Sequence, residues 1–454
     1  MSRYKAYPEY RDSEIAGVGV IPATWQIMQL KRSVNDCVNG IWGAEPEGDG
    51  SDTIVIRVAD FDRARLSVLG DGYTFRKIDE KEKKSRLLTG GDLLLEKSGG
   101  GEKTLVGQVV LFDKEFEAIT SNFVAKMTPR SGFSSRYLNY VFSRFYSSNI
   151  NFCSIKQNTG IQNLDSASYL AEKFCFPAFC EQEAIATFLD HETAKIDALI
   201  EKQQRLIELL KEKRQAVISH AVTKGLNPKA PMQDSGAEWV DAVPKHWRVS
   251  KLSYHASVSN GATPSRENML FWENGTIGWL NSSKVNDGVI EEADQFITEL
   301  ALSKTSVKPV TQGDLVMAIT GEGQTRGRVA ICNTNATINQ HLASISIYDE
   351  WLSHEFLYLW LEGNYERIRY ESEGAGSTKG AITCSEIGAF PVILPPLEEQ
   401  DQIVRYVTER KHKFDGLVRE AVSAIELMQE RRTALISAAV TGKIDVRDWQ
   451  PAAA

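Results

Sequence analysis

Residues Cys180–Leu226 read CEQEAIATFLDHETAKIDALIEKQQRLIELLKEKRQAVISHAVTKGL, and this stretch decides the fold. Its apolar residues recur with the seven-residue spacing of a coiled-coil seam, interrupted only at Gln203. A helix over residues 181–221 would be about 60 Å long, which exceeds an ordinary globular helix. A helix with one apolar stripe of this length requires a partner. The seam residues are Leu189, Ile196, Leu210 and Val217, with Leu199 and Leu206 at companion positions.

The partner lies in the same chain. Residues Glu398–Ile444 read EEQDQIVRYVTERKHKFDGLVREAVSAIELMQERRTALISAAVTGKI. The two stretches superpose without a gap at a shift of 218 residues, which places Glu181 on Glu399. The chain is therefore internally duplicated, and a duplication predicts a repeated structural unit. The seam residues of the second copy are Val407, Phe414, Leu417, Met428 and Leu435.

The duplication extends beyond the helices. A Pro-x-x-Trp motif ends at Trp25 and recurs at Trp247, a shift of 222 residues. A pattern of strand, glycine-rich loop and strand begins at Gly91 and recurs from Gly313 at the same shift. Short β-branched runs separated by turn signals surround these motifs. The sequence therefore predicts two similar α+β domains, each followed by a long helix.

The boundaries of these segments follow from the motifs and from composition. Residues 224–236 are rich in proline and glycine, as expected of a linker between domains. Later in the domains the alignment loosens, and Thr120–Asn122 falls on Thr337–Asn339 at a shift of 217. We predict a globular domain over 1–178, a long helix over 179–226, a second globular domain over 227–396 and a second long helix over 397–446.

The short linker sets the direction of the helices. About a dozen residues span at most ~40 Å when extended, which is too short to return along the first helix. We therefore expect an antiparallel coiled coil that relates the two domains by an approximate twofold axis. Two inverted reading surfaces at a fixed separation suit duplex DNA, whose strands are related by twofold symmetry. Because the loops of the two copies differ, we predict a bipartite, asymmetric DNA site with an unread spacer.

Composition excludes several classes of protein. No apolar run is long enough to cross a bilayer, and the first residues lack the apolar core of a signal peptide, so we expect an intracellular protein without a membrane partner. The six cysteines have no CxxC spacing and the histidines no metal-ligand spacing, so we expect reduced thiols and no metal site. With a net charge of −8, local basic patches or partners must meet any nucleic acid.

The candidate DNA-binding residues lie in polar or glycine-rich loops of both copies. Arginine and glutamine recognise guanine and adenine edges, and small or basic residues contact the phosphate backbone. A solvated turn explains each residue about equally well, and for Asn339–Gln340 a strand cap is the better interpretation. The candidates are Lys97, Ser98, Lys103, Lys156, Gln157, Asn158 and Thr159 in the first copy and Thr320, Gln324, Arg326, Arg328, Asn339, Gln340, Ser377 and Lys379 in the second.

No sequence motif indicates catalysis. There is no GxxxxGK[ST] phosphate loop and no Asn/Asp-Pro-Pro-Tyr/Phe run of the kind that adenine methyltransferases carry. The glycines over residues 321–327 do not form a dinucleotide loop, because the chain continues as a strand rather than a helix. Residues 80–83 resemble a nuclease Glu-x-Lys motif but lack a supporting carboxylate. We therefore predict no catalytic residue in this chain.

Taken together, the paired motifs resemble the DNA specificity subunit of type I restriction-modification systems. The resemblance rests on the Pro-x-x-Trp openings, the Pro-x-x-x-Glu-Gln helix entries and the Ile-Ser-x-Ala-Val-Thr helix exits, and it covers nearly the whole chain. It implies a non-catalytic, cytoplasmic prokaryotic subunit with two target recognition domains for double-stranded DNA. It also implies that methyltransferase subunits, two by expectation, dock on the helices, and the candidate partner-binding residues are Glu181, Gln182, Glu399 and Gln400.

The resemblance further implies how the chemistry is shared. Methyltransferase subunits would use S-adenosylmethionine, a restriction and translocase subunit would use ATP and magnesium, and this chain would bind no cofactor. Two other functions stay open. A coiled-coil adaptor with protein-binding ends would suit the acidic balance, but the Lys- and Arg-bearing loops at matched positions argue against it. A freestanding nuclease would need a cluster of metal-binding carboxylates that the sequence lacks.

Overall fold

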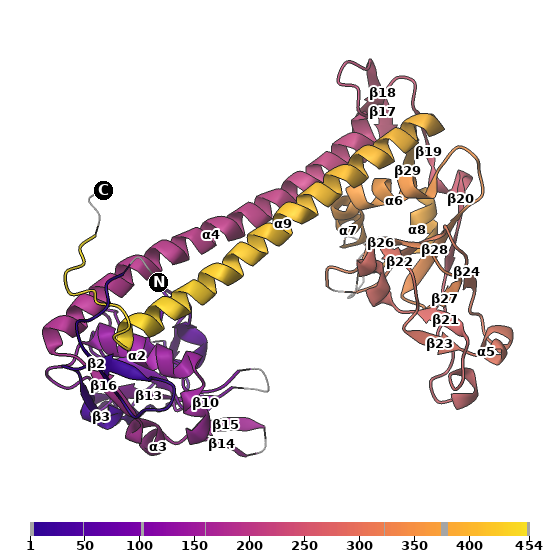
Figure 1. The fold of residues 1–454 in the computed structure, drawn as a ribbon. Helices are drawn as coiled ribbons and strands as arrows, with labels where there is room; N and C mark the ends of the chain where they lie inside the picture. Colours follow the sequence, from indigo (N-terminus) through magenta and orange to yellow (C-terminus); the bar gives the residue numbers. More distant parts are fainter. Residues whose placement is uncertain are drawn as a thin grey trace. The chain divides into compact units, whose positions relative to one another are not determined.

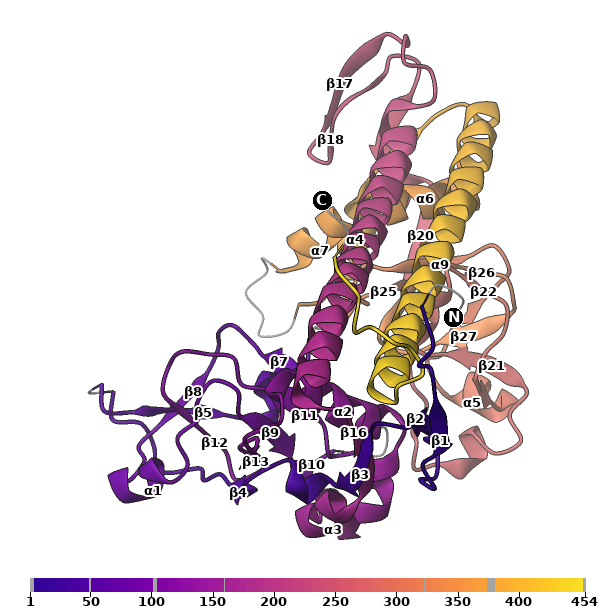
Figure 2. The same ribbon diagram turned by 60° about the vertical axis from the view of Figure 1, so that its left-hand side comes forward.

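The computed structural model describes residues 4–48, 50–100, 104–158, 160–321, 323–373 and 380–451. The chain divides into two compact units. Unit 1 comprises Met1–Gln204 and Val422–Ala454, and unit 2 comprises Arg205–Ala421. Each unit contains one globular domain and one part of each long helix, α4 (Phe179–Lys224) and α9 (Leu397–Val440), which Figures 1 and 2 show. The predicted mixture of sheets and two long helices is confirmed.

The long helices are antiparallel within unit 1. Ile185 near the start of α4 shares a core with Val440 at the end of α9. Further along α4, Asp197 pairs with Arg432 of α9, with 3.0 Å between Oδ1 and Nε. The two helices therefore run in opposite directions in this unit.

The helices are also antiparallel within unit 2. Val222 at the end of α4 shares a core with Ile403 near the start of α9. Arg214 of α4 lies 3.8 Å from Asp415 of α9. The shift of 218 relates this pair to the ion pair of unit 1, so the duplicated helices make the same contact twice with their roles exchanged.

The predicted seam is buried only in part. Leu189 belongs to the core of unit 1, but Leu199 in the same unit is 51% exposed. In unit 2, Leu206 is 43% exposed and Leu417 is 39% exposed. These three leucines of the predicted seam and its companion positions are therefore exposed. Two helices bury only the face between them, whereas Leu189 is also covered by the globular domain.

The domain of unit 1 is built on a six-stranded sheet of order β4-β13-β9-β11-β7-β6, against which α2 packs. The remaining strands form smaller sheets of order β12-β5-β8, β10-β15-β14, β16-β3 and β1-β2. Its elements are β1 (Tyr10–Asp12), β2 (Val20–Pro22), β3 (Gln26–Gln29), β4 (Val38–Asn39), β5 (Thr53–Ile56), β6 (Phe61–Asp62), β7 (Ser67–Val68), β8 (Thr74–Arg76), α1 (Glu80–Lys84), β9 (Leu93–Glu96), β10 (Ser98–Gly99), β11 (Val109–Leu111), β12 (Ala118–Thr120), β13 (Val124–Met127), α2 (Ser135–Ser147), β14 (Ile155–Asn158), β15 (Ile161–Leu164), α3 (Ser166–Ala171) and β16 (Lys173–Phe176).

The domain of unit 2 repeats this plan with a five-stranded sheet of order β20-β28-β25-β26-β22, against which α6 packs. A four-stranded sheet of order β23-β21-β27-β24 and the pairs β17-β18 and β19-β29 complete it. Its elements are β17 (Met232–Ala237), β18 (Val240–Pro244), β19 (Arg248–Lys251), β20 (Ala256–Asn260), β21 (Ile277–Leu280), β22 (Val289–Ile290), β23 (Gln295–Ile297), α5 (Glu299–Lys304), β24 (Pro309–Val310), β25 (Leu315–Ala318), β26 (Val329–Cys332), β27 (Ala336–Ile338), β28 (Leu342–Ile347), α6 (His354–Gly363), α7 (Tyr365–Glu373), α8 (Cys384–Ala389) and β29 (Pro391–Leu394).

The paired sequence motifs meet each other in both units. In unit 1 the indole N–H of Trp25 and the hydroxyl of Tyr7 donate to Glu181 Oε1, at 2.9 and 2.7 Å. In unit 2 the indole N–H of Trp247 donates to Glu399 Oε2 at 3.0 Å. The tryptophan of each domain opening is therefore tied to the glutamate at the start of the helix that follows the domain.

The glutamine after each of these glutamates is buried and joins three segments. Gln182 Oε1 accepts the N–H of Ser134, and Gln400 Oε1 accepts the N–H of Ser353, at 3.0 and 2.9 Å. These serines are the N-caps of α2 and α6. Each glutamine Nε2 donates to the carbonyl of the entry proline, at 3.0 and 2.9 Å. One buried amide thus fixes the long helix, the proline before it and the helix of the domain.

In each unit the domain opening also packs against the end of a long helix, α9 in unit 1 and α4 in unit 2. A Cβ at Gly442, after α9, would lie 2.3 Å from Pro22 Cδ in unit 1. A Cβ at Gly225, after α4, would lie 3.0 Å from the ring of Trp247 in unit 2. Both glycines have φ near +70°, the left-handed conformation that commonly ends a helix. Each domain opening therefore packs against the end of one helix while it bonds to the start of the other.

Removing the buried amide should destabilise unit 1. Gln182→Ala leaves the buried N–H of Ser134 and a carbonyl without partners, and we expect it to lower the free energy of unfolding by about 1–3 kcal/mol. The matched control is Gln204→Ala, at an exposed position of the same helix, which should change stability by less than about 0.5 kcal/mol. Urea unfolding followed by circular dichroism measures both, and equal effects would contradict the structural role.

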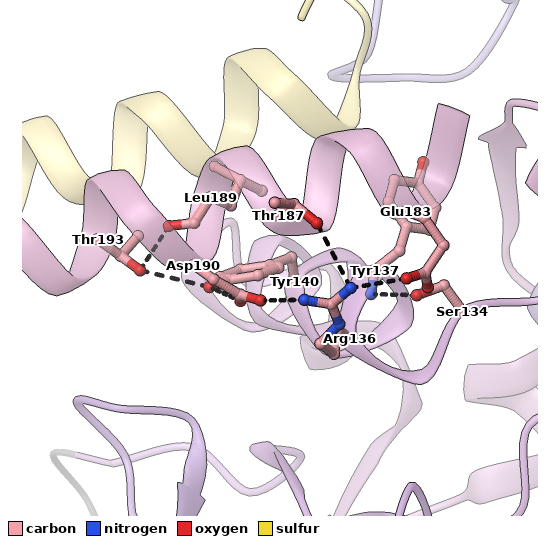
Figure 3. Close-up of polar contacts among 9 residues, drawn as sticks. All are labelled: Ser134, Arg136, Tyr137, Tyr140, Glu183, Thr187, Leu189, Asp190 and Thr193. Atoms are coloured by element: carbon pink, nitrogen blue, oxygen red, sulfur yellow. Dashed lines mark hydrogen bonds and ion pairs between the residues drawn. The ribbon is translucent and has the colours of Figure 1, made fainter. Parts of the chain in front are cut away.

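A second network holds α2 against α4 in unit 1 (Figure 3). Arg136 on α2 donates to Glu183 Oε2 at 2.6 Å and to Asp190 Oδ2 at 2.7 Å, two turns apart on α4. The hydroxyl of Tyr140 donates to Asp190 Oδ1 at 2.8 Å. Burial would raise the pKa of Glu183, but hydrogen bonds from Ser134 and Arg136 outweigh it and lower that pKa. The network therefore favours the ionised carboxylate.

The corresponding junction of unit 2 has the opposite charge arrangement. Lys411 of α9 donates to both carboxylate oxygens of Glu362 on α6, at 3.0 and 2.8 Å. Its Nζ also lies 5.1 Å from the centre of the Tyr358 ring. The cation belongs to the domain helix in unit 1 and to the long helix in unit 2. The same frame is thus held by different side chains.

The junction of unit 1 should depend on pH. A carboxylate with a lowered pKa stabilises the fold above its unfolded pKa, and this contribution is lost as pH falls through the folded pKa. Arg136→Met should therefore lower stability at pH 7, by about 1 kcal/mol because the side chains are partly exposed. The difference from wild type should shrink below about pH 4. Urea unfolding at several pH values tests this, and a difference that is constant from pH 7 to 3.5 would contradict it.

Candidate nucleic-acid interface

Two close glycine contacts bring the same pair of segments together in each unit. A Cβ at Gly40 would lie 1.9 Å from Thr120 O, and one at Gly261 would lie 2.1 Å from Ile338 O. Neither position can hold a larger residue without moving the backbone. In both units the amide after the glycine donates to that same carbonyl, at 2.9 and 3.0 Å. The two copies therefore build this turn in the same way.

These hydrogen bonds correct the sequence alignment by one residue. Thr120 corresponds to Ile338, a shift of 218, whereas the alignment at a shift of 217 paired it with Thr337. The following bonds agree, because the carbonyls of Phe123 and His341 both accept from the end of the strand before the glycine-rich loop. The alignment followed identical residues in an exposed turn, whereas the backbone hydrogen bonds define which residues are equivalent. Equivalent side chains are therefore Asn122 with Gln340 and Phe123 with His341.

In unit 1 the predicted residues Ser98 and Lys156 lie on one three-stranded sheet. Figure 1 shows β10, β15 and β14 beside one another in this unit. Ser98 Oγ donates to Asn163 Oδ1 at 2.6 Å, and Lys156 is the partner of Asn163 in the neighbouring strand. The ammonium of Lys156 lies 2.8 Å from Asp165 Oδ2, and its side chain is 72% exposed. An exposed cation and two short polar side chains thus share one surface.

Lys97 connects this sheet to the glycine turn. Its ammonium donates to Asn39 Oδ1 at 2.8 Å, and its backbone N–H donates to Phe123 O at 2.8 Å. Asn122 and Phe123 are exposed beside it, and so is Trp42, two residues after the glycine. The surface of unit 1 therefore combines amides, a lysine and aromatic rings, which are side chains suited to bases and phosphates.

In unit 2 the equivalent surface is a chain of hydrogen bonds. His341 Nδ1 lies 2.7 Å from Thr320 Oγ1, and His341 Nε2 lies 3.1 Å from Gln340 Nε2. The hydroxyl of Thr263 donates to Gln340 Oε1. Because the amide nitrogen of Gln340 can only donate, His341 Nε2 accepts and Nδ1 carries the proton in this arrangement. The chain presents ordered hydrogen-bonding groups at the surface of the unit.

The arginines of the second glycine-rich loop hold that loop. Arg326 is 4% exposed and donates to Gly321 O at 3.2 Å. Arg328 Nε donates to Gln324 O at 2.9 Å, and its guanidinium lies 5.5 Å from the centre of the Tyr365 ring. Gln324 itself is exposed. The arginines therefore order the loop, and base contact by any of the three stays a prediction.

The other predicted residues divide into three groups. Asn339 is buried, and its Oδ1 accepts the N–H of His341 at 2.9 Å, as the strand-cap interpretation predicts. Gln157 and Asn158 lie on the backbone of β14. Lys103, Thr159, Ser377 and Lys379 fall outside the described residues.

Sequence reasoning missed several residues of this surface. Trp42, Asn122, Phe123 and His341 were not among the candidates, although they lie beside Lys97 or Thr320. The signal was present in the two glycines, since Gly40 and Gly261 occupy equivalent places in the copies. It could not be interpreted without the hydrogen bonds that give the register.

The predicted partner-binding residues have internal partners. Glu181 and Glu399 accept hydrogen bonds from the core tryptophans, and the two glutamines that follow them are buried. A role in binding other subunits stays a prediction for all four, namely Glu181, Gln182, Glu399 and Gln400.

The described part of the chain contains neither a metal-binding cluster nor a membrane-spanning helix. Among those residues no group of three or more histidine, cysteine, aspartate or glutamate side chains could hold a metal ion. Over the same residues, no helix combines the length and the apolar character needed to cross a membrane.

Comparison with known proteins finds relatives over nearly the whole chain. A family model described as the type I restriction modification DNA specificity domain matches residues 244–414. The MjaIX type I restriction enzyme specificity subunit of Methanocaldococcus jannaschii is 24% identical over 460 residues, which cover 99% of each chain. The EcoKI specificity subunit of Escherichia coli strain K12 is 24% identical over 385 residues, covering 81% of this chain and 78% of that relative.

Solved structures share the fold. A chain from a structure of a type I restriction-modification system has a TM-score of 0.65 at 16% identity and covers 92% of this chain and 98% of its own. The HsdS subunit from Thermoanaerobacter tengcongensis has a TM-score of 0.52 at 15% identity, with coverage of 93% and 98%. The paired motifs, the family model over residues 244–414 and the full-length relatives agree, and the chain is similar to type I restriction-modification DNA specificity subunits.

Proposed function

We propose that this chain is the sequence-reading DNA subunit of a type I restriction-modification complex and performs no chemistry itself. The observation that carries the proposal is that the copies keep one frame but differ in the surface it presents. The same glycine turn carries Asn122 and Phe123 in unit 1 and Gln340 and His341 in unit 2. Different side chains on equivalent backbones would read different half-sites, and the target would be bipartite and asymmetric.

The chemistry of these side chains supports contact with DNA. Asparagine and glutamine can bond an adenine edge with both amide groups, and arginine and lysine can bond guanine or phosphate. The net charge of −8 disfavours tight binding to DNA by this chain alone. We therefore infer that partner subunits supply much of the positive charge that neutralises the phosphates.

The long helices suit the docking of methyltransferase subunits. Leu199 and Leu427 are exposed in unit 1, and Leu206 and Leu209 are exposed in unit 2. Apolar side chains left exposed along a helix can be buried by a partner protein. We propose that two methyltransferase subunits, which use S-adenosylmethionine, dock there. A restriction and translocase subunit with ATP and magnesium would complete the complex.

Selection from random DNA tests this function. The chain is assembled with its methyltransferase partner, incubated with a random-sequence duplex library, and the retained DNA is sequenced. We expect two enriched blocks separated by a constant number of unselected base pairs. Absence of any enrichment would contradict the proposal and favour the adaptor interpretation, in which the globular domains bind proteins.

Substitutions in the two turns should separate the half-sites. Gln340→Ala should relax the preference at one position of one block, and Asn122→Ala should relax one position of the other, because each removes an amide that can contact a base edge. The expected loss of discrimination is about 5- to 150-fold, equivalent to ~1–3 kcal/mol. Each variant is the control for the other. Relaxation of both blocks by one variant would contradict separate readers.

The long helices should set the unread spacer. Each helix is unbroken and contributes residues to both units. Deleting seven residues from both α4 and α9 keeps the seam in phase and should shorten the spacer without changing either block. Library selection with the deleted chain measures this, and an unchanged spacer would count against it.

A further inference from the structure

Unit 1 contains a cavity of about 400 Å³ beside the glycine turn. Trp42, Arg57, Ser121, Asn122 and Phe123 contribute to its walls. The cavity lies in the same surface as the predicted DNA contacts, because Phe123 O accepts the backbone N–H groups of the residues at positions 97 and 98, at 2.8 and 3.2 Å. Its position, its aromatic rings and one buried hydroxyl indicate a ligand.

The aromatic walls are partly exposed, and the indole is held in place. Trp42 is 37% exposed and Phe123 is 45% exposed. The guanidinium of Arg76 lies 4.4 Å from the centre of the Trp42 ring, which fixes the indole by a cation–π contact. Aromatic rings offer a large flat apolar surface, and a partly exposed ring can stack on another ring. The indole of Trp42 is therefore held in place beside the cavity and can stack on a flat ring.

The polar groups of the cavity fit a ring with a hydrogen-bonding edge. Ser121 is 1% exposed, and its hydroxyl has no hydrogen-bond partner among the described residues. A buried polar group without a partner is costly, and a ligand can satisfy it. Asn122 is exposed at the rim, and Arg57 is oriented by Asp60, with 2.8 Å between Nη2 and Oδ1. Donors and acceptors thus surround the aromatic walls.

Unit 2 differs at the corresponding positions. The residue two after its glycine is Thr263, and the residue that corresponds to Phe123 is His341. Both belong to the hydrogen-bonded chain through Gln340. Asn339 corresponds to Ser121, and its side chain is satisfied by the backbone. The aromatic walls and the unpaired hydroxyl are therefore features of unit 1.

We propose that this cavity takes one nucleobase of the half-site read by unit 1, after that base has left the stack. The inference rests on the proposed DNA-reading function and specifies how one of the two units reads. A base within a duplex exposes only its edges in the grooves, so its faces can meet aromatic side chains only when it is unstacked. Trp42 and Phe123 contact the faces of the base, and Ser121, Asn122 and Arg57 contact its edge.

Fluorescence of 2-aminopurine tests this in the assembled complex with its methyltransferase. The probe replaces each purine of the selected site in turn, and permanganate reactivity reports each thymine. We expect one position in the block of unit 1 to become unstacked in wild type and to return to background in Trp42→Ala. That substitution and Phe123→Ala should each weaken binding about tenfold.

Control measurements distinguish a base bound in this cavity from other causes of the signal. A base extruded by the methyltransferase would remain unstacked in Trp42→Ala, so only a signal that depends on Trp42 supports the cavity. Trp351→Ala removes another exposed indole, in unit 2 and outside these segments, and should change neither signal nor affinity. Ser121→Ala keeps the aromatic walls and should weaken binding to the preferred base while other bases at that position are tolerated better.

The outcomes separate the two proposals. If wild type selects a bipartite site but no unstacked position depends on Trp42, the base-binding cavity is wrong while the DNA-reading function stands. The cavity is also wrong if Trp42→Ala weakens binding without changing any stacking signal, since the indole would then pack against the groove. If no site is selected at all, the DNA-reading function itself fails.

Discussion

A buried glutamine amide at the start of each long helix is the constraint on which the structure depends. Gln182 and Gln400 each satisfy the first turn of a domain helix and the carbonyl of the entry proline. The glutamate before each glutamine binds the tryptophan of the domain opening. Since these groups come from three distant segments, the start of the helix can form its contacts only when the domain has folded around it. We therefore expect each domain and the start of its long helix to fold cooperatively.

This frame leaves the exposed turns free to differ. The close contacts at Gly40 and Gly261 are made to backbone atoms, so they do not fix which exposed side chains lie beside them. In unit 1 those side chains are aromatic and amide groups beside a lysine, and in unit 2 they form a hydrogen-bonded chain. A duplicated chain can in this way keep its architecture while its two surfaces diverge, which is what an asymmetric DNA site requires.

The polar junctions between domain and helix show the same freedom in charge. Arg136 binds two carboxylates of α4 in unit 1, whereas Lys411 of α9 binds a carboxylate of α6 in unit 2. Ion pairs at partly exposed positions contribute modestly, so either arrangement serves. The buried amides are under a stricter requirement, because an unsatisfied buried group costs more than such a pair contributes. This difference explains why the glutamines match between the copies while the charges of these two domain junctions do not.

The sequence by itself determined the duplication, the mixed fold, the two long helices and their antiparallel direction. Periodicity, a constant shift and the length of a linker are properties of a one-dimensional string. Only the tertiary structure decided that Leu199 and Leu206 are exposed, that Arg326 is buried, and that Thr120 corresponds to Ile338. It also brought Trp42 beside Phe123 and gave Glu181 and Gln182 their internal partners. Burial and hydrogen bonding depend on residues far apart in the chain, and no local pattern records which of them will meet.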